Sequence, residues 1–204
     1  MAWSDITGWY GFEHTYRRAV DAAQDGDVFV ELGVAFGRSV AHLARMCIDN
    51  GKKVKIYAID PWTDDNWAAT EEDDPCKVWP SWGGEDAEKV KRIGGPYSAF
   101  LDSMRTHAPE ELEYIKPLRL YSYEAAKLFA PGSLKLCMID ANHFYKPVLE
   151  DILTWMPKVR PDGILAGDDY SDADFPGVVK AVKEVFGPDG YQIEGSYRTT
   201  WVKK

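Results

Sequence analysis

Apolar positions along the chain recur with the period of a helix in some segments and form short runs in others. In residues 12–24 the apolar side chains share the spacing of one buried helix face. The segment Val28–Leu32 is short and mostly apolar, which predicts a strand. A second helix is expected from Val40 to Cys47, with Gly51 just past its end. The chain therefore begins as helix, strand and helix.

The same alternation continues to the C-terminus. Four more strands are expected in short apolar runs: Lys55–Ile59, Leu118–Leu120, Leu134–Ile139 and Ile164–Ala166. Three more helices are expected: residues 96–107, Tyr145–Met156 and Val178–Phe186. Pro161-Asp162-Gly163 predicts a turn before the last of these strands. Two final strands, Tyr191–Glu194 and Thr199–Val202, are expected to pair through Gly195-Ser196 as a hairpin.

Strands that alternate with helices form a parallel sheet covered on both faces. We therefore predict an α/β fold, a doubly wound, mostly parallel, seven-stranded and Rossmann-like sheet with an antiparallel C-terminal hairpin, in a single domain over residues 1–204. Ligands of such sheets bind beyond the carboxyl ends of the strands. Those ends hold most of the unusual residues: Gly33–Ser39, Asp60, Ser122, Asp140–His143 and Gly167–Tyr170.

Residues 61–112 fit the alternation poorly and are expected to form an insertion. From Trp62 to Cys76 there are six acidic residues and no basic one. Charges of this kind usually lie on a solvated surface, but a long loop with several large aromatic side chains usually packs on something. We expect a lid on the acceptor side of the site, with a tryptophan able to stack on a bound ring: Trp62, Trp67, Trp79 or Trp82.

Charge and composition narrow the function classes. The net charge is −9 and the pI is near 5.0, which argues against binding to nucleic acid or anionic lipid. No apolar run is long enough to span a membrane, no secretory signal is visible, and the three cysteines show no CxxC spacing. We expect a cytoplasmic protein whose partner is a small-molecule acceptor. Several N-terminal aromatic residues would permit a homodimer: Trp3, Trp9, Tyr10 and Phe12.

The segment Glu31–Ser39 reads as the end of a strand, a glycine turn and the start of a helix. Gly33 allows a tight turn and Gly37 allows a ligand to approach closely, while the helix directs free N–H groups at that ligand. The pattern is not GxGxxG, which disfavours a nicotinamide or flavin cofactor. Asp60 ends the next strand, and a carboxylate there suits the two hydroxyl donors of a ribose.

Acidic residues follow two later strands. Asp140 and Asp168-Asp169 are separated by one helix and one strand, so a parallel sheet brings them together. Three close carboxylates repel one another unless they are protonated or bridged by a cation, and oxygen ligands suit Mg²⁺. Alternatively, Asp168 and Asp169 only cap a turn. His143 either accepts a hydroxyl proton as a neutral imidazole or is a hydrogen-bonded histidine without a catalytic role.

These motifs resemble the class I S-adenosylmethionine-dependent methyltransferases, and more narrowly the metal-dependent O-methyltransferases of the macrolide and aminocoumarin sugar type. The resemblance runs from about Asp27 to Tyr170. The matching motifs are ExGxxxGxS at Glu31–Ser39, the acid Asp60, SxEAA at Ser122–Ala126, DAxHxY at Asp140–Tyr145, and PxGxxxGDDY ending at Tyr170. One departure is Leu120-Tyr121, where relatives commonly have Gly-Asp before the serine.

The resemblance implies S-adenosyl-L-methionine as cofactor and a set of roles for the matching residues. Asp60 would bind the ribose of the cofactor, and Ser122 would lie by its adenine. The remaining contacts, including those with the methionine part, would come from Glu31, Gly33, Gly37, Ser39 and Asp140. Three acids would hold Mg²⁺: Asp140, Asp168 and Asp169. His143 would be the catalytic base, assisted by Asp140, because related catechol-type enzymes carry a lysine at the matching offset.

We therefore expect an O-methyltransferase that acts on a small hydroxyl acceptor such as a sugar or a phenolic diol. A metal-independent methyltransferase acting on oxygen or nitrogen is one alternative. A catalytically inactive binding protein of the same fold is another. A dinucleotide oxidoreductase is the third, although the glycine spacing counts against it.

Overall fold

The computed structural model describes residues 2–63, 90–195, 197 and 199–204. The predicted lid therefore lies only partly within it. Trp62 and residues 90–112 are described, whereas the other three lid tryptophans lie outside the described residues: Trp67, Trp79 and Trp82.

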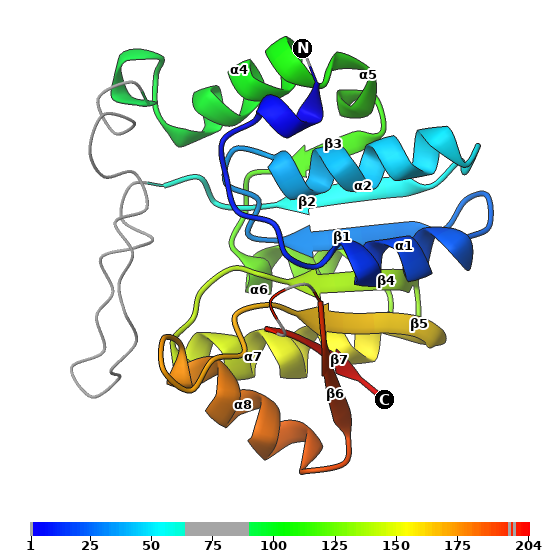
Figure 1. Ribbon diagram of the computed structural model, residues 1–204, viewed down its shortest axis with the longest axis vertical. Coiled ribbons are helices and arrows are strands. Elements are labelled where there is room, and N and C mark those ends of the chain that lie inside the picture. Colours follow the sequence, from blue (N-terminus) through cyan, green and yellow to red (C-terminus); the bar gives the residue numbers. More distant parts are fainter. Residues whose placement is uncertain (1, 64–89, 196, 198) are drawn as a thin grey trace.

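One seven-stranded sheet forms the centre of the protein (Figure 1). Its strands are β1 (Val28–Leu32), β2 (Lys55–Ile59), β3 (Ile115–Leu118), β4 (Leu134–Ile139), β5 (Val159–Gly167), β6 (Tyr191–Glu194) and β7 (Thr200–Lys203). They lie in the order β3-β2-β1-β4-β5-β7-β6, and only β7 pairs antiparallel, with β5 and with β6. The predicted fold class, including the C-terminal hairpin, is confirmed.

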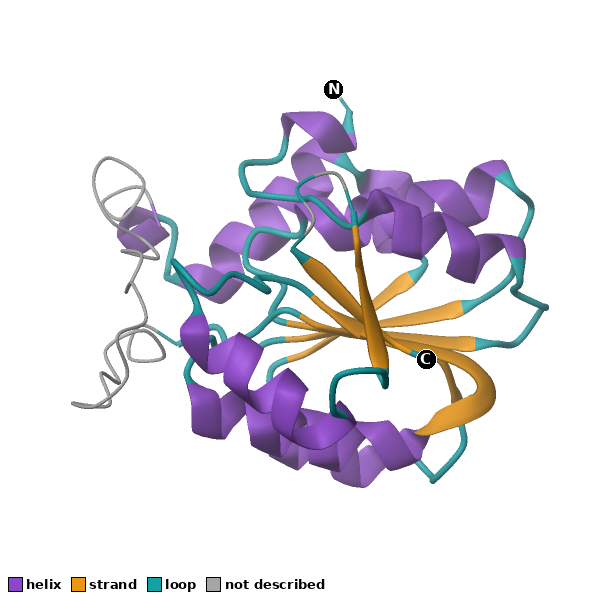
Figure 2. Cartoon of the chain, turned by 60° about the horizontal axis from the view of Figure 1, so that its bottom comes forward, coloured by secondary structure: helices purple, strands orange, loops and turns teal. Residues whose placement is uncertain are grey.

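Helices cover both faces of the sheet, as Figure 2 shows around the fan of strands. One layer contains α1 (Glu13–Asp21), α2 (Arg38–Asp49), α4 (Pro96–His107) and α5 (Pro109–Leu112). The other contains α6 (Ser122–Ala125), α7 (Tyr145–Trp155) and α8 (Pro176–Phe186). Three short 3₁₀ turns are also described: η1 (Trp3–Asp5), η2 (Ala126–Leu128) and η3 (Met156–Lys158). No described helix is long and apolar enough to cross a membrane.

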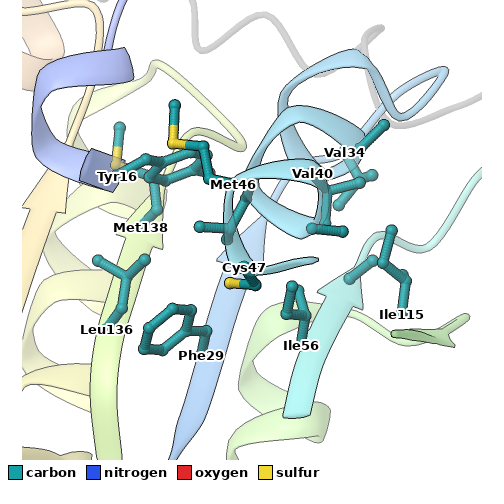
Figure 3. Close-up of a cluster of buried hydrophobic side chains, with 14 of the residues drawn as sticks. Tyr16, Phe29, Val34, Val40, Met46, Cys47, Ile56, Ile115, Leu136 and Met138 are labelled. Carbon is teal, nitrogen blue, oxygen red and sulfur yellow. The ribbon is translucent and has the colours of Figure 1, made fainter. Parts of the chain in front are cut away.

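Strands in the middle of the sheet contribute side chains to two separate cores because successive residues of a strand face opposite sides. Phe29 and Leu136 belong to the core under α1, α2 and α4 (Figure 3), whereas Val30 and Cys137 belong to the core under α7 and α8. As a consequence β4 is apolar except for Lys135, and all six of its residues are buried.

The order of the strands places the switch point between β1 and β4. From β1 the chain builds outward through β2 to β3, and then returns to the other side of β1 as β4. The connections leaving the carboxyl ends of β1 and β4 therefore run in opposite directions, which opens the crevice where ligands of such sheets bind.

Two strand predictions need correction. The third strand is Ile115–Leu118, not Leu118–Leu120; Pro117 is tolerated there because β3 lies at the edge of the sheet and pairs with β2 alone. The predicted turn at Pro161-Asp162-Gly163 instead lies within β5. The ladder is irregular there, since a step of two residues in β4 faces a step of five in β5, so turn-forming residues occupy a bulge.

The N-terminal aromatic residues are mostly internal rather than exposed. Phe12 is buried, and the ring of Trp3 stacks on His42 of α2 with centroids 3.9 Å apart. Tyr10 packs edge-on against both Phe12 and His42. Only Trp9 remains largely exposed, at 79%. These rings attach the N-terminal segment to α2. Most of the N-terminal aromatic side chains are therefore not available to a partner subunit, and the homodimer stays a prediction.

Candidate active site

The turn after β1 is shaped by a close contact with the end of β4. Gly33 has a φ of +78°, and a Cβ atom on it would lie 1.9 Å from the main-chain oxygen of Asp140. Only glycine fits at this position. Gly37 also has a positive φ, but its missing Cβ would meet Met104 and Phe100 of α4. The absence of a side chain at Gly37 leaves room for these two side chains of α4, and the close approach of a ligand at Gly37 stays a prediction.

Asp60 holds this turn from the neighbouring strand. One carboxylate oxygen accepts the N–H groups of Val34 and Ala35, at 2.9 and 3.1 Å, and the other accepts the N–H of Trp62 at 2.7 Å. Burial raises the pKa of Asp60, while these three N–H donors lower it. The indole N–H of Trp62 in turn donates to the carbonyl of Ala35. The structure shows Asp60 ordering the turn; its contact with a ribose stays a prediction.

Glu31 lies beneath the turn and is fully buried. Its carboxylate accepts a hydrogen bond from the Tyr16 hydroxyl, at 2.6 Å, and another from the Ser39 hydroxyl. Burial raises the pKa of Glu31 to about 7, although both hydrogen bonds lower it. Two of the predicted cofactor residues, Glu31 and Ser39, are therefore bonded to each other inside the protein. The sequence motifs alone do not indicate Tyr16 as a partner of Glu31.

Ser122 begins α6 and donates a hydrogen bond to Asp151 of α7. Asp151 is buried in this position, and burial raises its pKa to about 7. Ser122 follows the end of β3, where the carbonyl of Leu118 accepts the N–H of Asp60. The predicted adenine contact thus belongs to the same edge of the sheet as the predicted ribose contact.

Three side chains converge beyond β4 and β5. Asp140, His143 and Asp169 each offer one ligand atom, and these atoms all lie within 4.8 Å of one another. The Nε2 atom of His143 is 2.7 Å from a carboxylate oxygen of Asp169. Burial, and then the charges of Asp169 and Asp168, raise the pKa of Asp140 well above its ordinary range. We call this set the Asp140–His143–Asp169 cluster.

Asp168 is not a member of this cluster. Its carboxylate accepts hydrogen bonds from the hydroxyls of Thr199 and Thr200, at 2.9 and 3.2 Å. Neighbouring residues at a strand end point in different directions, which separates Asp168 from Asp169. The structure thus unites two of the three predicted metal ligands with the predicted base. Asp168 still lines the small cavity that Asp140 and His143 also line.

Backbone strain is concentrated at the same edge of the sheet. Among the described residues, three that are not glycine have a positive φ: Ala35, Trp62 and Asp169. They follow the carboxyl ends of β1, β2 and β5 within three residues. Conformations of this kind cost about 1–3 kcal/mol each and tend to be retained at functional sites. This distribution independently marks the carboxyl edge as the site.

The donor set of the cluster fits a divalent cation. Two carboxylates and an imidazole are ligands found around ions such as Mg²⁺, Mn²⁺ or Fe²⁺, with oxygen donors favouring the first two. Burial contributes most to the raised pKa of Asp140, and the charges of Asp169 and Asp168 add to it; a bound cation would favour the ionised form of all these acids.

Comparisons with known proteins agree with this fold. Residues 30–170 match the family described as "Methyltransferase domain". No curated protein matches the chain significantly. The solved structure of CalS11, a TDP-rhamnose 3'-O-methyltransferase in calicheamicin biosynthesis, is 15% identical with a TM-score of 0.57, and the alignment covers 94% of this chain and 76% of that one.

Two further structures are similar. The O-methyltransferase NovP is 17% identical, with a TM-score of 0.60 and coverage of 94% of this chain and 78% of that one. Cofactor-bound Rv0187 from MTB is 12% identical, with a TM-score of 0.56 and coverage of 98% and 84%. At such low identity, these likenesses show a shared fold.

Proposed function

Since this chain belongs to the methyltransferase domain family and is an S-adenosylmethionine-dependent methyltransferase, we propose that it methylates a hydroxyl group of a small acceptor with the help of Mg²⁺. The observation that carries the proposal is that Asp140 contacts the glycine turn and also belongs to the acidic cluster. Its main-chain oxygen lies against Gly33 of the glycine turn, and its side chain belongs to the Asp140–His143–Asp169 cluster. A methyl donor on that turn would be adjacent to groups able to activate a hydroxyl.

S-adenosylmethionine would bind across the carboxyl ends of β1, β2 and β4. In this proposal the turn at Gly33 faces the methionine part, Asp60 faces the ribose and Ser122 lies near the adenine. Three further residues would support the turn from inside the protein: Glu31, Gly37 and Ser39. Glu31 and Ser39 are bonded to each other, and Gly37 is packed against α4. A cofactor held in line with its acceptor removes much of the entropic barrier to transfer, since the sulfonium methyl is already activated.

Asp140 and Asp169 would hold the metal ion. Asp168, the third predicted ligand, would join them only if its carboxylate left Thr199 and Thr200. When bound, the cation would lower the pKa of an acceptor hydroxyl and orient a pair of neighbouring oxygens. An acceptor with two neighbouring oxygens would bind such a cation best, which favours a vicinal diol, either of a sugar or of a phenolic ring.

His143 would take the proton of the acceptor. The contact between its Nε2 atom and Asp169 fixes the ring and favours the tautomer with hydrogen on Nε2. The lone pair of Nδ1 is then available to accept a proton, and the carboxylate stabilises the imidazolium that forms.

A metal-independent methyltransferase is the second candidate. The pairing of His143 with Asp169 favours it, because a carboxylate-oriented imidazole can act as a base without a cation. The two candidates differ in one respect: only the first predicts that turnover stops in excess chelator.

The test combines ligand binding and turnover. The midpoint temperature of thermal unfolding should be raised by S-adenosylmethionine and by S-adenosylhomocysteine but not by NAD. Methyl transfer from labelled cofactor to a panel of sugar nucleotides and catechols should require Mg²⁺ and stop with excess EDTA. Full turnover in EDTA would leave the metal-independent reaction, and binding without turnover of any acceptor would indicate a binding protein of this fold.

A further inference from the structure

We infer that Tyr16 is a positioning residue for the methyl donor: its hydroxyl, acting through Glu31, holds the glycine turn and the start of α2 in the arrangement that binds the cofactor. The inference rests on the proposed cofactor site. It concerns a side chain in α1, a helix that contributes no residue to the predicted set of contacts.

Glu31 is held from two helices at once. The Tyr16 hydroxyl of α1 donates to one carboxylate oxygen at 2.6 Å, and the Ser39 hydroxyl of α2 donates to the other. All three side chains are buried, and Tyr16 is among the largest fully buried side chains of the protein. A buried carboxylate is costly unless its oxygens are hydrogen-bonded, so both bonds are needed to keep it in place.

The bonds of Glu31 connect directly to the turn. Ser39 is the second residue of α2, so its bond to Glu31 of β1 holds the N-terminus of this helix, where the first N–H groups have no partner within the helix. The other side of the turn is held separately, because the Gly33 N–H donates to the carbonyl of Ile59 and Asp60 accepts two N–H groups. Through Glu31, α1 is therefore hydrogen-bonded to the end of β1 and the start of α2, the two elements that flank this turn.

The charge on Glu31 depends on the same contacts. Tyr16 and Ser39 donate to it, the charge of Asp60 acts on it, and its own charge acts on Tyr10 and Asp140. Loss of the Tyr16 hydroxyl removes one of the two hydrogen bonds that lower the pKa of Glu31, so the carboxyl would become protonated at a higher pH than in the wild type. The neutral acid competes less well for the Ser39 hydroxyl and frees the start of α2.

Tyr10 provides a matched control. Its ring lies 5.9 Å from the ring of Tyr16 in the same aromatic group. Its hydroxyl is buried like that of Tyr16, but it makes no hydrogen bond to any described residue. Tyr10→Phe and Tyr16→Phe therefore remove the same atom from the same region, and only the second removes a bond to Glu31.

The experiment is calorimetric titration of wild type, Tyr16→Phe and Tyr10→Phe with S-adenosylhomocysteine between pH 5.5 and 8.5. Tyr16→Phe is expected to lower affinity about tenfold near pH 7, a typical effect of losing a hydrogen bond to a charged group. It should also shift the pH midpoint of binding upward. Tyr10→Phe should keep the wild-type midpoint and an affinity within about twofold.

Each outcome decides the question. Wild-type binding together with the same affinity and midpoint in both variants would overturn the role of Tyr16 while leaving the proposed function intact. No binding by the wild type would overturn the proposed function and this inference with it. Should Tyr16→Phe fail to fold, Ser39→Ala removes the opposite bond of Glu31 and must show the same upward shift, or the inference is wrong.

Discussion

The imidazole of His143 lies 2.7 Å from the carboxylate of Asp169, although the two residues follow different strands of the sheet. Asp169 reaches this position through a positive φ of 61°, and the ring of His143 also packs against Phe175. A strained backbone is thus retained where it brings an imidazole and a carboxylate together.

Replacement of His143 should affect turnover and not cofactor binding. His143→Ala removes the proton acceptor and should lower kcat about 10²–10⁴-fold, the usual contribution of a general base. The affinity for S-adenosylhomocysteine, measured by calorimetry, should stay within about twofold because the ring lies outside the glycine turn. His14→Ala, an exposed change on α1, is the control. An unchanged kcat in His143→Ala would remove this residue as the base.

Replacements of the three acids should weaken metal binding to different degrees, according to whether the acid belongs to the cluster. Asp140→Asn and Asp169→Asn should each weaken Mn²⁺ binding about 10-fold or more in an EPR titration, because each removes a ligand atom of the cluster. Asp168→Asn should have a smaller effect, since its carboxylate is bonded to Thr199 and Thr200. Asp172→Asn, on the exposed surface, is the control. The cluster is not the metal site if Asp168→Asn proves the most damaging of these changes.

Gly33 should tolerate no side chain. Gly33→Ala combines a positive φ with a collision against the main chain of Asp140, so the free energy of unfolding should fall by more than the roughly 1–3 kcal/mol expected for the φ alone. Binding of S-adenosylhomocysteine should be lost as well. Gly51→Ala is the matched control because Gly51 has a φ of +63° and open space around it. Urea unfolding and calorimetry measure both effects; equal losses in the two variants would contradict the close contact.

The buried acid Asp151 should make stability fall as the pH rises. Its pKa is about 7 in the folded protein and near 3.8 when exposed, so between these values the folded state holds a proton that the unfolded chain has released. The stabilisation is present below pH 4 and is lost as the pH rises through about 7. Asp151→Asn should remove this part of the slope and raise the free energy of unfolding at pH 8, by up to about 4 kcal/mol at 1.36 kcal/mol per pKa unit.

Urea unfolding at pH 5, 7 and 8.5 measures that slope. Glu113→Gln, at an exposed position after α5, is the control and should keep the wild-type slope. Buried Glu31 adds a slope of the same sign in all three proteins. An Asp151→Asn protein with the wild-type pH dependence would show that Asp151 is ionised in the folded state throughout this range.

Apolar patterning predicted the sheet and most of its helices because each element buries a continuous apolar face. Boundaries were less predictable where a proline or glycine lay inside a strand. Pro117 argues against a strand at β3 unless that strand lies at the edge of the sheet, and the sequence alone does not give the order of the strands. Gly163 suggested a turn where β5 carries a bulge.

The location of the site was predictable, but its contacts were not. Strand ends brought Asp140 near Asp169 as expected, because parallel strands end at one edge of the sheet. The direction of Asp168 depends on the hydroxyls of a distant hairpin, and no spacing within Gly167–Tyr170 reveals it. Similarly, the bond between Tyr16 and Glu31 requires the packing of α1 on the sheet, which periodicity alone does not specify.

A crystal structure with S-adenosylhomocysteine and Mn²⁺ tests the central claim most directly, namely that methyl donor and acceptor are brought together at Asp140. We predict the cofactor sulfur beside the Gly33 turn, and an anomalous manganese peak bound by Asp140 and Asp169 within the same crevice. A cofactor seated elsewhere, or a manganese ion remote from the sulfur with no shared cavity, would contradict it.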